Sequence, residues 1–107
     1  MNVQVNTSNN VAGAEAWSNA MEATVRGRLA RFESRLTRVE VHVGDESAPP
    51  TAGPDKRCSI EARPAGFDPI TVSDTADTID KATSGALAKL TTALDRTFGK
   101  TTSRKGH

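Results

Sequence analysis

The stretch VRGRLARFESRLTRVEVHV, residues 25–43, contains the change of hydrophobic period that decides the fold. As far as Leu36, its apolar residues recur every three or four positions, which is the period of an amphipathic helix. Beyond Leu36, Val39, Val41 and Val43 alternate with polar residues, which is the period of a half-buried strand. The stretch therefore predicts a helix that is followed directly by a strand.

The sequence on either side extends this pattern to a whole domain. The helical stripe reaches back to about Ala14, and the segment MNVQVNTS before it alternates like a short strand. On the other side, RCSIEARPAG and ITVSDT alternate in the same way, and a helical period returns beyond Asp77. The predicted element order is βαβββα. Because each strand has one apolar and one polar face, we expect an α/β (α+β) two-layer sandwich: a four-stranded sheet with two helices on one face and water on the other.

Length and composition are those of one small domain. A chain of 107 residues is long enough for a single modest core, and a charged fraction of 25% is ordinary. We expect residues 1–100 to form one domain and residues 101–107, TTSRKGH, to form a disordered tail. The N-terminus lacks a signal-peptide pattern, no apolar run approaches a membrane span, and Cys58 has no disulfide partner. These features predict a cytoplasmic protein that does not contact a membrane.

The residues that carry most enzymatic and metal chemistry are too few and too scattered to form a site. One cysteine, Cys58, and two distant histidines, His42 and His107, cannot make a zinc site. No catalytic triad is visible, and the glycines have no phosphate-loop spacing. Cys58 lies at an inward strand position, where we expect a small buried hydrophobe. We therefore expect no enzyme activity, no cofactor, no metal and no small-molecule substrate.

Basic residues are sorted to one side of each predicted helix. On the first helix, a sector roughly 80° wide beside the apolar stripe holds four arginines, at about 100° per residue. They are Arg28, Arg31, Arg35 and, if the last helical turn persists, Arg38. The basic residues on one side of the second helix are Lys89, Arg96 and Lys100. Asp80 and Asp95 lie on its opposite side. We expect the two basic flanks to converge on the outer surface between the helices.

The residues alone leave two interpretations of these basic flanks open. A net charge of +1 gives no global attraction to a polyanion, and a charged helix face often only keeps a small protein in solution. The preference for arginine favours contact with nucleic acid, because the planar guanidinium binds phosphate through two hydrogen bonds. The repetition of the sorting on a second helix favours it too.

Three segments resemble a known protein family. They are VQVNTSNNV at the start, LARFESRLTRVEVHV in the first helix and second strand, and GALAKLTTALDR in the last helix. Their joint order, from about Val3 to Lys100, is similar to that of the ribosome hibernation factors. This is the family of hibernation-promoting factor and ribosome-associated inhibitor, also called sigma modulation proteins, and the chain resembles its short form. The family fold itself resembles a double-stranded RNA-binding domain with an added strand.

The resemblance implies a function and a partner. Members of this family are not enzymes; they bind the small ribosomal subunit at the decoding region and silence translation under stress or in stationary phase. Carried over to this sequence, the residues expected to bind rRNA are Arg28, Arg31, Arg35, Arg38, Lys89, Arg96 and Lys100. Thr92 departs from the family pattern, which commonly has an arginine there.

The alternative function belongs to a different class. A chain of the same fold without an RNA role would be an interaction module that binds a protein partner or forms a weak homo-oligomer. The contact would use the open sheet face or an edge strand. The low net charge and Thr92 favour this alternative. Co-sedimentation with ribosomes at low salt distinguishes the two functions.

Overall fold

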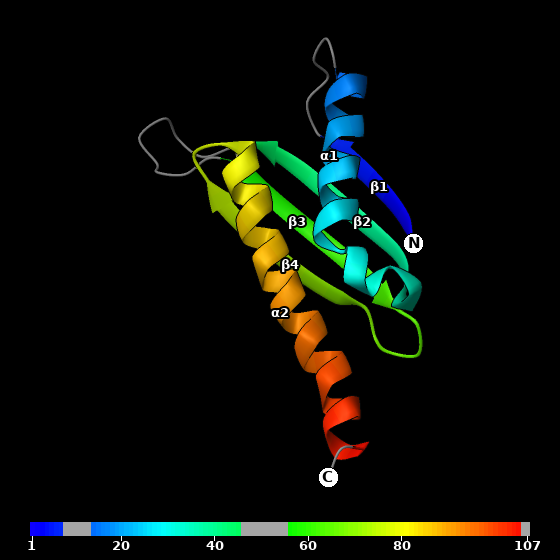
Figure 1. The fold of residues 1–107 in the computed structure, drawn as a ribbon. Coiled ribbons are helices and arrows are strands. Elements are labelled where there is room, and N and C mark those ends of the chain that lie inside the picture. Colours follow the sequence, from blue (N-terminus) through cyan, green and yellow to red (C-terminus); the bar gives the residue numbers. More distant parts are fainter. Residues whose placement is uncertain (8–13, 46–55, 106–107) are drawn as a thin grey trace.

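The predicted strands and helices form in the predicted order (Figure 1). A computed structural model describes residues 1–7, 14–45 and 56–105. The elements are β1 (Asn2–Thr7), α1 (Ala14–Arg28), the 3-10 helix η1 (Ala30–Arg35), β2 (Leu36–Asp45), β3 (Lys56–Pro64), β4 (Ile70–Ala76) and α2 (Ile79–Lys105). The βαβββα prediction is therefore confirmed, with η1 as an addition between the first helix and the second strand.

The four strands form one mixed sheet in the order β1-β2-β3-β4. β1 is parallel to β2, with Val3 opposite Val39, and β3 is antiparallel to both of its neighbours. The register places Val41 opposite Ile60 and Ile60 opposite Val72. Because side chains alternate along a strand, the apolar residues of all four strands share one face and the polar residues share the other.

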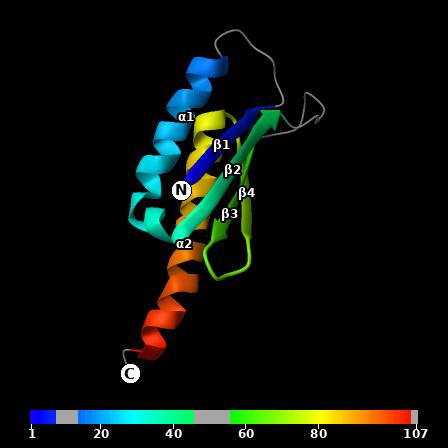
Figure 2. The same cartoon turned by 90° about the vertical axis from the view of Figure 1, so that its right-hand side faces the viewer.

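Both helices lie on the apolar face of the sheet (Figure 2). α1 packs on β1, η1 packs on β2, and α2 packs on β3 and β4. The buried helical residues include Met21, Val25, Leu29, Phe32, Ala82, Ala86, Leu90 and Leu94. The prediction of a two-layer α+β sandwich with a solvated sheet face is therefore confirmed.

The first helix is shorter than predicted. The expected helix to Leu36 is wrong, because α1 ends at Arg28 and the next turn is η1. The Leu29 amide donates to Val25 O at 3.0 Å, whereas the Phe32 amide donates to Leu29 O at 2.9 Å, so the hydrogen bonds tighten from four residues to three. The spacing of three residues between Leu29 and Phe32 suits both an α-helix and a 3-10 helix, so the hydrophobic period does not distinguish between them. β2 begins at Leu36, which moves Arg38 from a helix to a strand.

α2 is long and approaches the sheet closely. It continues through Lys105 and projects past the sheet (Figure 1), so the segment 101–105, expected in a disordered tail, is helical here. Residues 106–107 lie outside the described residues. A Cβ at Gly85 would collide with the carboxylate of Asp74 on β4, so glycine at this position permits the close contact between helix and strand. Leu87, next to Ala86 on the apolar side of α2, is also fully buried.

Cys58 is buried in β3 beneath the helices, which confirms its expected place in the core. Burial raises the pKa of its thiol, because the low-dielectric interior disfavours the thiolate. Cys58 is therefore a protonated core residue at neutral pH.

Candidate nucleic-acid interface

Arg28 is an exposed cation at the end of α1. It has no acidic partner within the described parts of the chain. Arg26, two positions earlier, donates to Glu22 Oε2 at 3.0 Å and to the Met1 carbonyl at 3.1 Å, which places it beside β1. Side chains two positions apart in an α-helix point in directions that differ by about 200° around the helix axis. Arg28 therefore projects from the opposite side of α1, towards α2.

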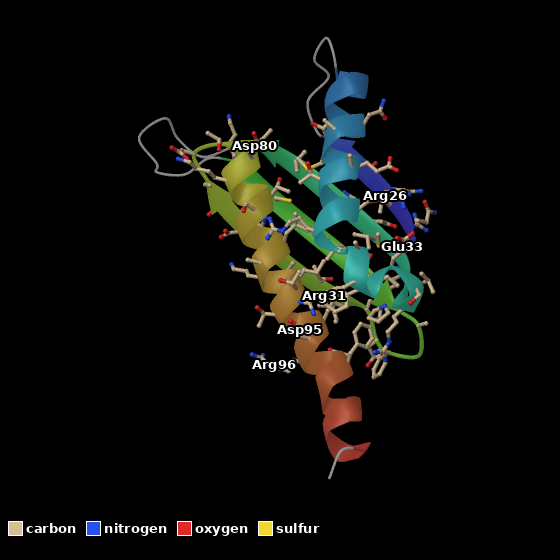
Figure 3. All side chains as sticks on the ribbon, viewed as in Figure 1. Arg26, Arg31, Glu33, Asp80, Asp95 and Arg96 are labelled. Atoms are coloured by element: carbon tan, nitrogen blue, oxygen red, sulfur yellow. The ribbon has the colours of Figure 1, made fainter. Side chains whose placement is uncertain are left out.

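Arg31 on η1 forms a two-pronged ion pair with Asp95 on α2 (Figure 3). Its Nη1 and Nη2 atoms donate to Oδ1 and Oδ2 at 2.6 and 2.8 Å. The guanidinium carbon also lies 4.3 Å from the centre of the Phe32 ring. The hydrogen bonds raise the pKa of Arg31 and lower the pKa of Asp95. Both groups are charged at neutral pH and both are exposed, so the pair joins η1 to α2 at the protein surface.

Arg35, also on η1, stacks on an aromatic cluster formed by Phe32, Phe67 and Phe98. Its guanidinium carbon is 3.8 Å from the centre of the Phe98 ring. Phe98 is buried, with ring centres 5.8 Å from Phe32 and 5.6 Å from Phe67, the latter edge to face. The Ala65 amide donates to Arg35 O at 2.9 Å, which fastens the turn between β3 and β4 to η1.

Lys89 and Arg96 of α2 lie on the side of the helix that is turned away from η1. The Lys89 ammonium donates to the Ser73 carbonyl at 2.9 Å and to Asp74 Oδ1 at 3.4 Å, both on β4. Arg96 is exposed, on the opposite side of α2 from Arg31 (Figure 3). The residues that line a shallow hollow on this side are Ala88, Lys89, Thr92, Ala93 and Arg96.

The expected convergence of the two basic flanks between the helices is wrong. The buried residues Leu90 and Leu94 fix the rotation of α2 about its axis. That rotation turns Asp95, not Arg96, towards η1. The cations therefore form two groups, one on each side of α2. Arg28, Arg31 and Arg35 make up the η1-side group, and Lys89 and Arg96 make up the β4-side group.

Arg38 belongs to neither group. It lies on β2 with its side chain on the open face of the sheet, where it donates to Gln4 Oε1 at 2.9 Å and pairs with Glu40 at 2.7 Å. The sheet separates it from the other candidate cations, so a single RNA surface on the helical side excludes it. Lys100 lies within α2, but its side chain is outside the described residues.

On the open face of the sheet, several basic side chains lie next to acidic ones. Besides pairing with Arg38, Glu40 lies 3.5 Å from the His42 ring nitrogen, and Arg63 lies 3.6 Å from Glu61. Acidic partners reduce the attraction of Arg38 and Arg63 for a polyanion. The helical side, where Arg28 and Arg96 have no such partner among the described residues, is the better candidate for contact with nucleic acid.

Sequence reasoning missed two features of this surface. The partnership of Arg31 with Asp95 depends on how α2 is rotated against η1, and the residues are 64 positions apart. The aromatic cluster had a weak signal, because Phe98 follows Leu94 by four positions on the apolar stripe. Phe67 had none, since it lies in a turn without periodicity.

No group of side chains that could hold a metal ion occurs in residues 1–7, 14–45 and 56–105. Within the same residues, no helix combines the length and apolar character needed to span a bilayer.

Comparison with known proteins gives a family and a fold. The family model described as Sigma 54 modulation protein / S30EA ribosomal protein matches residues 5–102. A ribosomal subunit interface protein from Coxiella burnetii superposes with a TM-score of 0.70 at 15% identity, over 92% of this chain and 99% of the other. The N-terminal domain of Protein Y from Thermus thermophilus superposes with a TM-score of 0.62 at 20% identity, over 90% and 98%. At these identities the two structures show a shared fold. No curated protein matches the sequence.

Proposed function

The chain belongs to the Sigma 54 modulation protein / S30EA ribosomal protein family, and on that premise we propose that it associates with ribosomes and holds them inactive. The proposed partner is the rRNA of the small subunit, at the decoding region. Bound there, the protein would occupy the space that messenger and transfer RNA need. The observation that carries the proposal is the family match, which extends over residues 5–102 and thus over nearly the whole chain.

The charge distribution supports RNA as the partner and the helical side as the contact surface. Arg28 and Arg96 are exposed and have no acidic partner among the described residues, so a phosphate would not have to displace one. Lys89 is exposed on the same side of α2 as Arg96, with one weak carboxylate contact at 3.4 Å. Arginine and lysine contacts to phosphate supply most of the sequence-independent affinity of proteins for nucleic acid. We therefore assign the rRNA contact to both groups of cations.

Two surfaces on either side of α2 suit a partner that is larger than one strand of RNA. A single strand following one group would leave the other group unused. Folded rRNA offers phosphates from several strands, so it can contact the η1-side group and the β4-side group together. This property of folded RNA favours a structured ribosomal site over a free single strand as the main partner.

Co-sedimentation tests the proposal. The protein is mixed with separated ribosomal subunits at low salt and resolved on sucrose gradients. We expect it to migrate with the small subunit and to inhibit translation in a purified system, with messenger RNA competing for the site. Absence from every ribosomal fraction would reject the proposal and favour the interaction module of the same fold.

We also propose that the protein acts in starved or stationary-phase cells. A factor that blocks the decoding region is useful only when protein synthesis must stop. Quantitative immunoblotting of ribosomal fractions across growth tests this timing. The expected result is enrichment on ribosomes after growth ceases, and constant occupancy during rapid growth would contradict it.

A further inference from the structure

Phe67 is the one large hydrophobic residue that is exposed among those the structure describes. The residue is 38% exposed, and it lies in the turn between β3 and β4. Gly66 before it has a φ of 84°, which glycine adopts without strain, and the Phe67 amide donates to Pro64 O at 3.2 Å. This tight turn holds the ring at the surface and keeps it out of the core.

The exposed ring is held in place. Its centre is 5.6 Å from that of buried Phe98, in an edge-to-face contact. The turn that carries it is fastened to η1 by the hydrogen bond from the Ala65 amide to Arg35 O. A ring fixed in this way loses little conformational entropy when a ligand stacks on it.

Guanidinium groups surround the same aromatic cluster. Arg35 stacks on Phe98 at 3.8 Å and Arg31 stacks on Phe32 at 4.3 Å, and both side chains are exposed. Two Arg31 nitrogens, Nη1 and Nη2, already donate to Asp95, whereas Arg35 has no acidic partner in the described segments. Asp68 is the acidic neighbour of Phe67 within the turn. Arg35 therefore offers hydrogen-bond donors for an anion at the same aromatic cluster that carries the exposed Phe67 ring.

We propose that Phe67 and Arg35 form a binding site for one unpaired nucleotide of single-stranded RNA. The base stacks on the Phe67 ring, and the adjacent phosphate accepts hydrogen bonds from the Arg35 guanidinium. A nucleotide matches this site because it combines a π-face with an anion, and stacking on aromatic residues tolerates any base. The proposal rests on the proposed function and deepens it: Phe67 takes a base, whereas Arg28, Lys89 and Arg96 take only phosphates.

The first test measures the affinity of the whole chain for a short fluorescent oligouridylate, which has little internal stacking. Phe67→Ala should weaken binding about tenfold, or about 1.4 kcal/mol, within the range found when one base loses its aromatic platform. Phe67→Leu keeps an apolar side chain but lacks the π-face, so we expect a similar loss. Asp68→Asn, in the same turn, is the matched control and should not weaken binding.

The second test observes stacking directly. Trp17→Phe removes the native tryptophan, and Phe67→Trp in that background places a single reporter in the turn. We expect the oligouridylate to quench its fluorescence, whereas the Trp17→Phe, Phe98→Trp variant, with its reporter at a buried position, should respond weakly. Thermal melts followed by circular dichroism check that each variant is folded.

Four outcomes separate this proposal from the proposed function. Loss of oligouridylate binding together with quenching supports the nucleotide site. Unchanged affinity in Phe67→Ala, while Arg28→Glu weakens ribosome binding, overturns the site and leaves the function in place. Quenching without any co-sedimentation of the parent chain supports the site and rejects the function. If Phe67→Ala weakens ribosome binding but leaves the affinity for oligouridylate unchanged, the ring contacts a ribosomal protein, and the nucleotide site is overturned.

Discussion

Arg31 and Asp95 join η1 to α2 through two parallel hydrogen bonds of 2.6 and 2.8 Å. The geometry is the one in which guanidinium binds phosphate, so the carboxylate occupies the same donors that an RNA phosphate would use. The pKa of Asp95 is lowered in the folded protein. Its contribution to stability is therefore present above its unfolded pKa of about 3.9 and lost as pH falls through the folded value. At neutral pH the pair is fully charged, and RNA must displace it.

Removing the Asp95 charge should tighten RNA binding. Asp95→Asn keeps the size of the side chain but no longer neutralises Arg31, so we expect about three- to tenfold higher affinity for the small subunit at low salt. Asp80→Asn makes the same change of net charge near the start of α2, far from Arg31 (Figure 3), and is the control. Filter binding of both variants measures the difference. An equal gain at both positions indicates a general charge effect, and weaker binding by Asp95→Asn would mean that Asp95 positions Arg31 for RNA.

Ribosome affinity should fall steeply with salt. Arg38 lies on the other face of the sheet, so six of the seven cations proposed from the sequence remain for phosphate contact. Six phosphate contacts, at roughly 0.7 per contact for unpaired and 0.9 for paired RNA, give a slope of about −4 to −5 for the logarithm of the binding constant against the logarithm of salt concentration. Arg38→Gln should leave the slope unchanged. A flat salt dependence would point to contacts with ribosomal proteins instead.

The strands were predictable and the charge arrangement was not, for a physical reason. Alternation in MNVQVNTS or ITVSDT reports directly which face of a strand meets the core, and the structure follows it. Periodicity also shows that Asp95 and Arg96 lie on different sides of the α2 stripe. It does not show which side faces η1, because that depends on the strand order and on the position of α2 over β3 and β4.

The end of the first helix could not be predicted from the sequence for a related reason. Buried residues at Leu29, Phe32 and Leu36 satisfy an α-helix as well as a 3-10 turn followed by a strand. The early end of α1 matters for the site, because it places Arg31 and Arg35 on the separate element η1. It also places Arg38 on β2, with its side chain on the open face of the sheet.

Cys58 should resist alkylation in the folded protein. Its thiol is fully buried, and burial raises its pKa, so both access and thiolate content are low. Because the folded pKa is the higher one, the stability contribution of the thiol is complete below its unfolded pKa of about 8.5 and is lost as pH rises further. Iodoacetamide labelling at pH 8, followed by mass spectrometry, should be slow in buffer and fast in urea. Equal rates in both would contradict the buried position.

Core packing beneath α2 should dominate stability. Leu90 is fully buried at the centre of the helix's apolar side, so Leu90→Ala should leave a cavity and cost about 2–5 kcal/mol. Lys81 is exposed and pairs with Asp77 one turn earlier at 3.3 Å, so Lys81→Ala should cost no more than about 0.5 kcal/mol. Urea denaturation measures both values. Similar midpoints for the two variants would show that the register of α2 on the sheet is wrong.

The RNA surface predicts unequal effects for two arginines that are two positions apart. Arg28 projects towards α2, whereas Arg26 points to β1 and is held by Glu22 and the Met1 carbonyl. Arg28→Glu places repulsion where phosphate is expected, so we predict about tenfold weaker binding to the small subunit. Arg26→Glu makes the same change of charge on the far side of the same helix, and its effect on binding should be less than about twofold.

This comparison holds composition, net charge and helix constant, so the variants differ in the direction of the side chain and in its local partners. Arg26→Glu also loses an ion pair and faces Glu22 one turn away, which costs a few tenths of a kcal/mol or somewhat more. Circular dichroism melts therefore accompany the gradient experiment, and the binding temperature is set well below the lower midpoint. Equal losses of binding would show that net charge alone attracts RNA. A larger loss at Arg26 would move the contact to the β1 edge, where the proposed surface does not extend.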